Sequence, residues 1–405
     1  MINVIGLGYI GLPTALMFAK SGLEVVGTDL NEDIVNKLNQ LNLTFEEEGL
    51  NDLFIQAINN GVFFSTEYIK ADIYIVAVPT PYVSESKKID PRYVVSAVNK
   101  ILEVCKTGSI IVIESTISPG TIDNFIRPII SNHNYQVGKD IHIAHAPERI
   151  IPGNMIYELE NNSRTIGVDS LEIGEILKET YSSFCRSEII LTDIRSAEMS
   201  KVVENTYRDI NIAFANELAK ICRKDNMDVY EIIKIANKHP RVNILQPGPG
   251  VGGHCISVDP WFLVGDYPDL TNLILTARKI NDSMPTHVLG RIRDIMREHN
   301  IRDISKIGLY GLAYKENVDD TRESPTLQLL NKMNDHLAFG VKVYDPYIKS
   351  EVVDNQYFDF SSFLEDIEII VIMTAHDHIK LNLEAIRNKL ILDTKNICEF
   401  NVYKL

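Results

Sequence analysis

The sequence predicts an α/β fold in which two parallel-sheet domains are joined by a helical central domain with a long connecting helix. Apolar runs rich in β-branched residues alternate with helical patterns at both ends of the chain. Such continuous runs are typical of strands that are covered on both faces of a mainly parallel sheet. Between the two ends lies a long stretch with helical periodicity and few strand signals. A chain of 405 residues has room for two or three such domains.

The first domain is expected over residues 1–193. It begins with a strand, a glycine turn, an apolar helix and a second strand that ends at Asp29. Helical patterns lie between most of the later strands, as the crossover connections of parallel strands require. These later strands are predicted at the apolar runs 72–78, 109–114, 141–145 and 188–191.

The central domain is expected over residues 194–300. One amphipathic helix is predicted over 194–224, and further helices over 229–238 and 270–300. The α/β rhythm then returns and defines a third domain, 301–405. We expect a small-molecule site where the two sheets face each other across the long helix, because ligand sites favour domain clefts. In the third domain, strands are predicted at 306–311, 341–345, 367–373 and 390–393, and a helix at 325–335.

Composition and charge argue against several classes of partner. The net charge of −15 disfavours nucleic acid or an anionic membrane as the main partner, so an anionic substrate would need a local cationic pocket. No apolar run is long enough to span a bilayer, and the first strand follows Met1 without a signal peptide, so we expect a cytoplasmic protein. The five cysteines are scattered without metal-ligand spacing, which fits a reducing compartment and predicts no metal site.

The amino terminus has the glycine spacing of a dinucleotide-binding turn, with Gly6, Gly8 and Gly11 between the first strand and helix. Gly6 permits the tight turn, Gly8 lets a pyrophosphate approach the backbone, and Gly11 allows close helix–strand packing. Asp29, at the end of the second strand, is placed to bind ribose hydroxyls and would repel a 2′-phosphate. The sequence therefore predicts a Rossmann-like domain that binds NAD rather than NADP. An α/β domain without a cofactor is the alternative.

A candidate nucleophile follows a glycine-rich loop. Four glycines and two prolines fall within residues 247–254, Cys255 comes next, and Asp259 follows four positions later. The small side chains let a ligand approach the thiol, whereas a cysteine that only packs normally lies in an apolar helix or strand. The alternative is a tight loop with an incidental thiol. For His254 we expect a structural or substrate-contact role, because neighbouring side chains in an extended loop usually point apart.

Further candidates lie at the carboxyl ends of predicted strands, where open α/β sheets bind ligands. Thr80 and Thr116 are candidates for contact with the nicotinamide half of the cofactor or a nearby water, and Glu148 for a base. Ordinary loop roles are the alternative for each. On the long helix, Lys201 and Asn205 are four residues apart and share a face, where they could stabilise an oxyanion and orient a water. A solvated surface role is the alternative for this lysine.

Taken together, these motifs resemble the UDP-glucose/GDP-mannose dehydrogenase family over nearly the whole chain. The runs 205–217 and 237–262 resemble its UDP-N-acetylhexosamine branch. Ser257 stands where the family more often has alanine or proline, a change that we expect to be tolerated. The motifs that carry the resemblance, in chain order, are Gly6-Leu-Gly-Tyr-Ile-Gly11, Val78-Pro-Thr-Pro81, Glu114-Ser-Thr116, Pro147-Glu-Arg149, Lys201-Val-Val-Glu-Asn205, Gly252-Gly-His-Cys255 and Thr321-Arg-Glu-Ser-Pro325.

The resemblance implies a four-electron oxidation of a nucleotide sugar at C6, with UDP-N-acetyl-D-mannosamine as the expected substrate. Cys255 would capture the intermediate aldehyde as a thiohemiacetal, and a second oxidation would leave a thioester for water to hydrolyse. By resemblance, Lys201 and Asn205 stabilise oxyanions, Asp259 and Thr116 position a water, and Glu148 is the base for hydrolysis.

The resemblance also implies two sets of binding residues and a homodimer. The first domain would bind NAD and the third the nucleotide sugar, while the central helices would pair two subunits. The implied NAD contacts are Gly6, Gly8, Tyr9, Ile10, Gly11, Asp29, Thr80, Thr116 and Arg322. The implied contacts to the nucleotide sugar are Glu148, Arg149, Lys201, Asn205, Arg208, Arg241, Asn243, Gly250, Gly253, Lys315 and Lys395, with Arg241 reaching the neighbouring subunit's site.

Three alternatives stay open at this point. The first is the same chemistry on UDP-N-acetylglucosamine, UDP-N-acetylgalactosamine or UDP-glucose. The second is a two-electron NAD dehydrogenase of the 6-phosphogluconate or hydroxyacid type, which would not need Cys255 and would form one NADH per substrate. The third is a non-catalytic sensor of NAD or a nucleotide sugar, which would bind its ligand without turnover.

Overall fold

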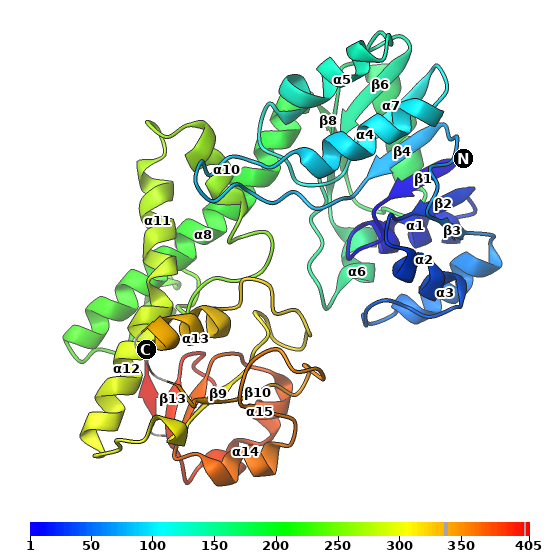
Figure 1. The fold of residues 1–405 in the computed structure, drawn as a ribbon. Helices are drawn as coiled ribbons and strands as arrows, with labels where there is room; N and C mark the ends of the chain where they lie inside the picture. Colours follow the sequence, from blue (N-terminus) through cyan, green and yellow to red (C-terminus); the bar gives the residue numbers. More distant parts are fainter. Residues whose placement is uncertain (336–338, 401) are drawn as a thin grey trace. The chain divides into compact units, whose positions relative to one another are not determined.

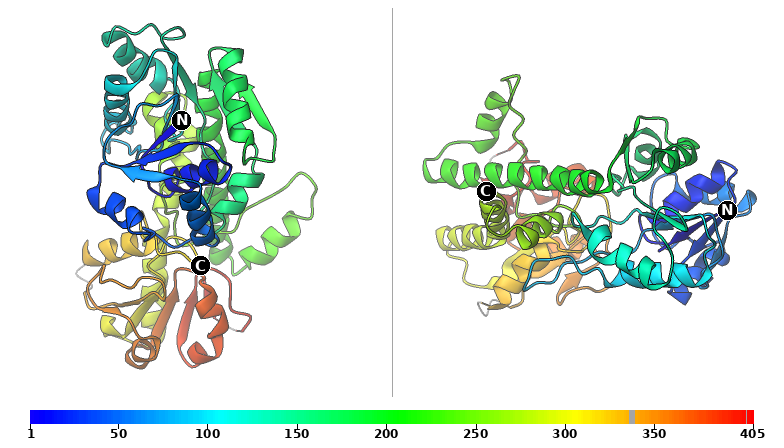
Figure 2. Two further views of the ribbon diagram at one scale, coloured as in Figure 1. Left: turned by 90° about the vertical axis from the view of Figure 1, so that its right-hand side faces the viewer. Right: turned by 90° about the horizontal axis from the view of Figure 1, so that it is seen from above.

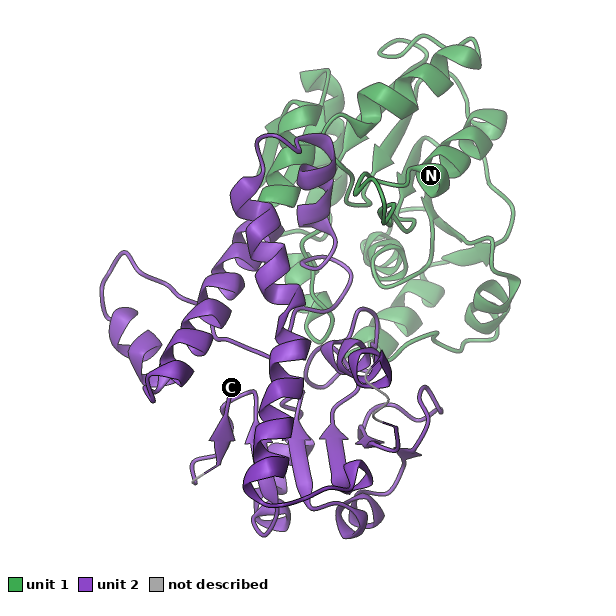
Figure 3. Cartoon of the chain, turned by 60° about the vertical axis from the view of Figure 1, so that its left-hand side comes forward, with its two compact units in different colours: residues 1–204 green, residues 205–405 purple. Residues whose placement is uncertain are grey.

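The computed structural model describes residues 1–335, 339–400 and 402–405 (Figure 1). The chain divides into two compact units, residues 1–204 and 205–405 (Figure 3). The boundary falls inside α8 (Ile194–Lys224), which has the bounds predicted from the sequence and is unbroken along its 31 residues (Figure 2). The three-domain division with boundaries at 193 and 300 stays a prediction.

The first unit contains an eight-stranded sheet with the order β3-β2-β1-β4-β5-β6-β7-β8. Its first six strands follow the 3-2-1-4-5-6 order of dinucleotide-binding folds, and all its pairs are parallel except β6 with β7. The strands are β1 (Ile2–Ile5), β2 (Val25–Thr28), β3 (Phe63–Ser65), β4 (Ile73–Val76), β5 (Ser109–Ile113), β6 (Ile141–His145), β7 (Arg164–Val168) and β8 (Ile189–Thr192).

Helices connect these strands and cover the sheet. Every residue of β1, β2, β4 and β5 is buried, which requires cover on both faces and explains why these runs are mostly apolar without alternation. The helices are α1 (Gly11–Lys20), α2 (Glu32–Asn39), α3 (Leu50–Asn59), α4 (Arg92–Val104), a π-helical turn (Ile122–Ile126), α5 (Arg127–Asn132), α6 (Met155–Asn161) and α7 (Leu171–Ser182).

The helical part of the second unit begins with the remainder of α8. It continues with α9 (Val229–Ala236), α10 (Asp259–Asp266), α11 (Asn272–Asp282) and α12 (Met284–Glu298). The helical pattern predicted over 270–300 forms two helices, α11 and α12, which are separated at Ser283. Pro285 lies in the first turn of α12, where its missing N–H group is tolerated.

A second sheet completes this unit, with the order β11-β10-β9-β12-β13-β14 and all pairs parallel. Numbered from its own first strand, this is again the order 3-2-1-4-5-6. On β12, Ile369 and Val371 pack in one core cluster, and Ile370 and Ile372 pack in another, so alternate residues face opposite sides of the sheet. Its strands are β9 (Ile307–Tyr310), β10 (Lys342–Tyr344), β11 (Gln356–Tyr357), β12 (Ile369–Ile372), β13 (Leu390–Asp393) and β14 (Tyr403–Lys404).

The remaining elements of the second unit are short apart from α13 (Pro325–Asp335), whose bounds match the prediction. They are a 3₁₀ turn (Ile304–Lys306), α14 (Phe360–Asp366), α15 (Asp377–Leu381) and α16 (Leu383–Ile386). None of the helices in the described ranges is both long and apolar enough to cross a membrane. The predicted fold class is confirmed, with two parallel-sheet regions, a helical region between them in sequence, and a long helix.

Candidate active site

The glycine turn after β1 has the space and strain that nucleotide binding requires. Gly6 has φ +91°, and a Cβ atom there would lie 2.5 Å from the Ala77 carbonyl oxygen. A Cβ atom on Gly11 would lie 1.8 Å from the Gly6 carbonyl oxygen, whereas one on Gly8 would meet nothing within 4 Å. Side chains are therefore excluded where the chain packs on itself, and the backbone at Gly8 stays open to a phosphate. The start of α1 has no side-chain cap. In its first turn Leu12 N donates to the Gly8 carbonyl oxygen at 3.1 Å and Pro13 has no N–H, so an anion here would meet only the remaining N–H groups.

Asp29, the residue predicted to bind the ribose, is held in place by backbone N–H groups of nearby residues. Asp29 Oδ2 accepts a hydrogen bond from Leu7 N at 2.8 Å, and Oδ1 accepts one from Asn31 N at 2.9 Å. These bonds hold the carboxylate at the end of β2, beside the glycine turn. The neighbouring Tyr9 packs its ring on Phe45 at a centroid distance of 4.4 Å, and Ile10 immediately precedes α1. The residues present thus fit a dinucleotide.

Two predicted loops of the first unit meet at the end of the sheet. Because β4 and β5 are neighbours, the loops that follow them lie side by side. The Thr80 hydroxyl donates to the Thr116 carbonyl oxygen at 2.6 Å. The two threonines singled out from the sequence therefore form one local structure at the carboxyl end of the sheet.

Glu148, the candidate base, is buried in an ionic cluster after β6. Its Oε2 accepts a hydrogen bond from Arg164 Nη2, and its Oε1 accepts one from the Arg149 backbone N at 2.7 Å. Arg149 itself pairs with Glu204 at 2.6 Å and donates to the Ser163 carbonyl oxygen at 2.8 Å. The Arg149 guanidinium is thus largely engaged within the protein.

In the second unit, Cys255 lies exposed at the turn that leads into α10. Its carbonyl oxygen accepts hydrogen bonds from Val258 N at 3.1 Å and Asp259 N at 2.8 Å. The Ser257 hydroxyl donates to the Gly253 carbonyl oxygen, so the unusual serine stabilises the same turn. These bonds fix the backbone on both sides of the cysteine and leave its side chain accessible.

The glycines before Cys255 are required by close packing within this unit. Gly253 has φ +85°, and a Cβ atom there would lie 2.7 Å from the Tyr314 ring. Gly250 has φ +147°, and a Cβ atom there would lie 3.2 Å from Pro325. Gly253 N also donates to the Arg322 carbonyl oxygen at 3.0 Å, which joins the loop to the segment before α13. The Arg322 side chain pairs with Asp320 at 2.6 Å.

Side chains of α8 hold the loop at several points. The amide of Asn205 donates to Asp259 Oδ2 at 2.6 Å, and both side chains are buried. Lys201, one turn earlier on α8, is also buried. Farther along the helix, Asn211 Nδ2 donates to the Asn243 carbonyl oxygen at 2.7 Å. The structure thus brings the side chains of Asn205 and Asp259 together.

A buried polar network reinforces these contacts. Arg278 on α11 is 2% exposed and pairs with Asp209 of α8 at 2.6 Å. Asn281 donates to the Asp209 carbonyl oxygen at 2.9 Å and accepts from Asn216 Nδ2 at 2.8 Å. Asn216 Oδ1 in turn accepts from Gly248 N at 2.9 Å. The network therefore joins α8 and α11 to the start of the glycine-rich loop.

A cationic pocket of about 570 Å³ lies in the same unit. Lys395, which follows β13, lines it together with two lysines from α9 and the loop after this helix. Lys315 lies between β9 and α13 and is half-buried, whereas Arg208 on α8 and Arg241 and Asn243 before the glycines are exposed. The lining residues are Tyr230, Lys234, Asn237, Lys238, Gln246, Lys395 and Asn396.

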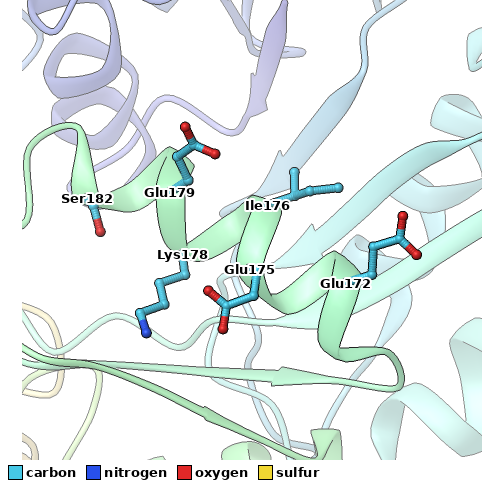
Figure 4. A pocket seen from close by; sticks show the side chains of 6 residues that line it. All are labelled: Glu172, Glu175, Ile176, Lys178, Glu179 and Ser182. Carbon is cyan, nitrogen blue, oxygen red and sulfur yellow. The ribbon is translucent and has the colours of Figure 1, made fainter.

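A second pocket, of about 540 Å³, runs along α7 (Figure 4). It contains none of the residues predicted from the sequence. Most of its ionisable side chains are acidic, which does not suit a nucleotide. Its lining residues are Glu172, Glu175, Ile176, Lys178, Glu179 and Ser182.

Three regions of the chain match one protein family, in order. Residues 1–185 match the NAD binding domain of the UDP-glucose/GDP-mannose dehydrogenase family, 195–283 its central domain and 308–400 its UDP binding domain. The chain belongs to the UDP-glucose/GDP-mannose dehydrogenase family. The resemblance drawn from the motifs is confirmed, and with it an NAD-dependent oxidoreductase whose glycine turn lies in the NAD-binding region.

Full-length relatives of this family are similar over both units. A protein of Methanocaldococcus jannaschii named UDP-N-acetyl-D-mannosamine dehydrogenase is 45% identical, over 98% of this chain and 92% of its own length. A Ralstonia nicotianae protein named NDP-N-acetyl-D-galactosaminuronic acid dehydrogenase is 39% identical, over 98% and 96%. The solved UDP-N-acetyl-mannosamine dehydrogenase of Staphylococcus aureus is 40% identical, with a TM-score of 0.89 over 100% of this chain and 97% of that one.

Sequence reasoning missed the buried charges behind the predicted residues. Asp209, Asn216 and Arg278 were not identified, although spacings of four and eleven from Asn205 place Asp209 and Asn216 on the same side of α8 as this asparagine. Arg164 was missed because β7 was not predicted. The charge of Arg164 at the start of this strand and Gly167 within it interrupt the apolar run. A charged residue inside a short β-branched segment was the available signal.

Proposed function

We propose that this family member oxidises the C6 hydroxyl of UDP-N-acetyl-D-mannosamine to UDP-N-acetyl-D-mannosaminuronate. The proposal is carried by the buried hydrogen bond between Asn205 and Asp259. Asp259 lies four residues after the exposed Cys255. The relatives named for this sugar support the choice of substrate. The Ralstonia relative makes the N-acetylgalactosamine isomer the second candidate.

Gly6, Gly8, Gly11 and Asp29 would hold NAD in the first unit, with contributions from Tyr9, Ile10, Thr80, Thr116 and Arg322. When bound, NAD accepts a hydride from C6 in each of two oxidations. The open backbone at Gly8 and the uncapped start of α1 receive the pyrophosphate. The Asp29 carboxylate accepts hydrogen bonds from the ribose hydroxyls.

Cys255 supplies the covalent step. Its sulfur bonds to the aldehyde carbon, and the carbonyl oxygen gains a proton, which gives a thiohemiacetal. Once C6 is oxidised again, the carbon remains bound to sulfur as a thioester. Water then adds to this carbon, Glu148 takes the proton of the water, and the C–S bond breaks with its electron pair returning to Cys255.

The other polar groups stabilise charge and orient the water. In the proposal the Lys201 ammonium and the Asn205 amide, on adjacent turns of α8, stabilise the oxyanion of each tetrahedral species. Asp259 is held by this amide at 2.6 Å and, with Thr116, positions the water. Each donor of this kind typically lowers a barrier by about 3–4 kcal/mol.

The nucleotide part of the substrate is assigned to the third domain of the predicted division. The lysines of the cationic pocket, Lys395 among them, suit a diphosphate in a protein with a net charge of −15. We assign Lys315 and Arg241 to the same anion, and Arg149, Arg208, Asn243, Gly250 and Gly253 to further substrate contacts.

The proposal includes a cytoplasmic homodimer. The solvent-exposed side of α8 carries Val203, Tyr207, Phe214 and Ile221, which are 46–62% exposed. Their spacings of four and seven residues form an apolar stripe of the kind that pairs helices. A reducing compartment is required to keep the Cys255 thiol available.

The covalent route is tested by replacing the nucleophile. Wild-type protein incubated with NAD and UDP-N-acetyl-D-mannosamine, then quenched in acid, is expected to contain an acyl-enzyme visible in the intact mass. Cys255→Ala is expected to form none and to lose turnover. Cys105→Ala, which removes a half-buried thiol of the first unit, is the matched control and should behave like wild type. Full turnover by Cys255→Ala would refute the thioester.

A further inference from the structure

Two buried carboxylates share one cation in the first unit. Glu114 follows β5, Glu148 follows β6 and Arg164 begins β7, and their side chains are 0%, 5% and 4% exposed. Arg164 Nη1 donates to Glu114 Oε1 at 2.9 Å, and Nη2 donates to Glu148 Oε2. The guanidinium thus binds one acid with each of its terminal nitrogens.

The other groups that face this cluster do not balance its charge. Tyr181 of α7 donates its hydroxyl to Glu114 Oε1 at 3.4 Å, and the Arg164 guanidinium carbon lies 4.6 Å from the centroid of its ring. Cys185, after α7, lies near Arg164 and carries no positive charge. His145 of β6 hydrogen-bonds the Ile113 carbonyl oxygen, and burial lowers its pKa to about 4, so it is neutral at pH 7.

Ionisation of both acids would therefore leave one buried negative charge without a partner, which is unfavourable. Among the described residues, Glu114 Oε2 has no hydrogen-bond partner, whereas Glu148 Oε1 accepts from Arg149 N at 2.7 Å. Glu148 is thus the better-solvated carboxylate, and Glu114 is the acid that keeps a proton. In agreement, burial raises the pKa of Glu114 to about 7, against the opposing effect of Arg164.

We propose that Glu114 and Arg164 are positioning residues for thioester hydrolysis. Glu114 stays protonated, so the positive charge of Arg164 pairs with Glu148 alone. The inference rests on the proposed role of Glu148 as the hydrolytic base. While Glu114 is neutral, Arg164 holds Glu148 as an oriented carboxylate. When Glu114 loses its proton, the two carboxylates compete for one guanidinium, and Arg164 no longer holds Glu148 alone.

The test is the pH dependence of hydrolysis in the full-length enzyme carrying Glu114→Gln, a neutral residue of the same shape. Decay of the Cys255 acyl-enzyme is followed by intact mass from about pH 5.5 to about pH 9. Wild type is expected to show an inflection near neutral pH, and Glu114→Gln is expected to lose it. At pH 6, where Glu114 is already neutral, the two rates should agree within about threefold. Arg164→Lys keeps a positive charge but lacks the two terminal nitrogens that bind the two acids. It should slow hydrolysis while the thioester still forms.

The control is Glu160→Gln, which removes a carboxylate paired with Lys20 and Arg186 in the same unit. It should keep the wild-type profile. An inflection that persists at the same pH in Glu114→Gln would overturn the proposal. So would an equal loss of rate at every pH, since a merely structural role predicts that result.

A second readout separates this inference from the proposed function. Infrared difference spectra between acidic and alkaline pH report the carbonyl stretch of a protonated carboxylic acid without any turnover. Wild type is expected to show this signal near neutral pH, and Glu114→Gln is expected to lose it. If wild type formed no acyl-enzyme, the proposed function would fail, yet the infrared signal would still decide where the proton lies. A signal that survives Glu114→Gln would contradict the assignment of the proton to Glu114.

Discussion

Asn205 and Asp259 show how single residues are prepared for their proposed roles. They lie 54 positions apart and meet in one buried hydrogen bond of 2.6 Å. Asp259 is also the first residue of α10, where the positive end of the helix dipole favours a carboxylate. The amide and the helix together fix the orientation of a charged group in the turn after Cys255.

Asp259→Asn is expected to lower kcat about 100-fold, because the neutral amide cannot orient the water as the carboxylate does. The KM values for sugar and NAD should change little, since the residue acts on the reacting atoms. Steady-state kinetics measure both quantities. Asp269→Asn, at an exposed position in the following loop, is the control and should match wild type. An unchanged kcat in Asp259→Asn would refute its role.

Glu114 should make stability depend on pH. Its pKa is raised from 4.5 to about 7, so between these values the unfolded chain has lost the proton that the folded chain retains. The free energy of unfolding contributed by this group therefore falls as pH rises through this window. Urea denaturation at pH 5, 6, 7 and 8 should show a smaller decrease for Glu114→Gln than for wild type. Parallel curves for the two proteins would contradict this.

At the scale of elements, α8 acts as the support of the cysteine loop. Its polar residues contact the loop and α11 at several separate places, while Ala215, Ala219 and Cys222 pack in a core cluster of the second unit. Because these contacts use side-chain amides and one buried ion pair, the loop is held without a regular element of its own. A long glycine-rich segment can thus present a reactive thiol in a defined place.

Asp209→Ala should destabilise the second unit by about 1–3 kcal/mol, because Arg278 loses its buried 2.6 Å partner and keeps only the partly exposed Asp282. Urea denaturation followed by circular dichroism measures this loss. The double variant Asp209→Leu with Arg278→Leu removes both charges and should recover much of the stability. If Asp209→Ala were as stable as wild type, the ion pair would not hold the loop.

Gly253→Ala should disturb the cysteine loop, since its φ of +85° and the Tyr314 ring 2.7 Å from an added Cβ both exclude a side chain. We expect a loss of about 1–3 kcal/mol in stability and a marked loss of turnover. Gly290→Ala is the matched control, because a Cβ there meets nothing within 4 Å and the position lies within α12. Differential scanning calorimetry should give Gly253→Ala a lower melting temperature than both wild type and the control.

For the whole molecule, the apolar stripe on α8 predicts self-association. Tyr207→Glu would place a charge in this stripe at a residue that is 62% exposed, so the fold should survive while pairing of two chains is lost. Sedimentation equilibrium should give a dimer for wild type and a monomer for the variant. Arg223→Glu, at an exposed residue on the opposite side of the same helix, is the control for a change of charge. A monomeric wild type would refute the homodimer.

Periodicity and glycine spacing predicted most of the fold. The bounds of α8 and α13 and the early strands followed directly from apolar patterns, because buried parallel strands and amphipathic helices leave strong signals. The two- and three-residue strands β3, β11 and β14 leave no such signal, since too few residues are buried. Among candidate site residues, motif positions were identifiable. The partners Arg164 and Arg278 were not, because an ion pair between distant segments has no local pattern.

The proposed thioester route requires that this protein remove four electrons from one UDP-sugar. The measurement is the amount of NADH formed per mole of limiting UDP-N-acetyl-D-mannosamine, with UDP-N-acetylgalactosamine, UDP-N-acetylglucosamine and UDP-glucose run alongside. Two equivalents are expected with the mannosamine sugar alone. One equivalent would contradict the thioester route and the role of Cys255. Two equivalents with a different sugar only would contradict the proposed substrate while leaving the chemistry in place.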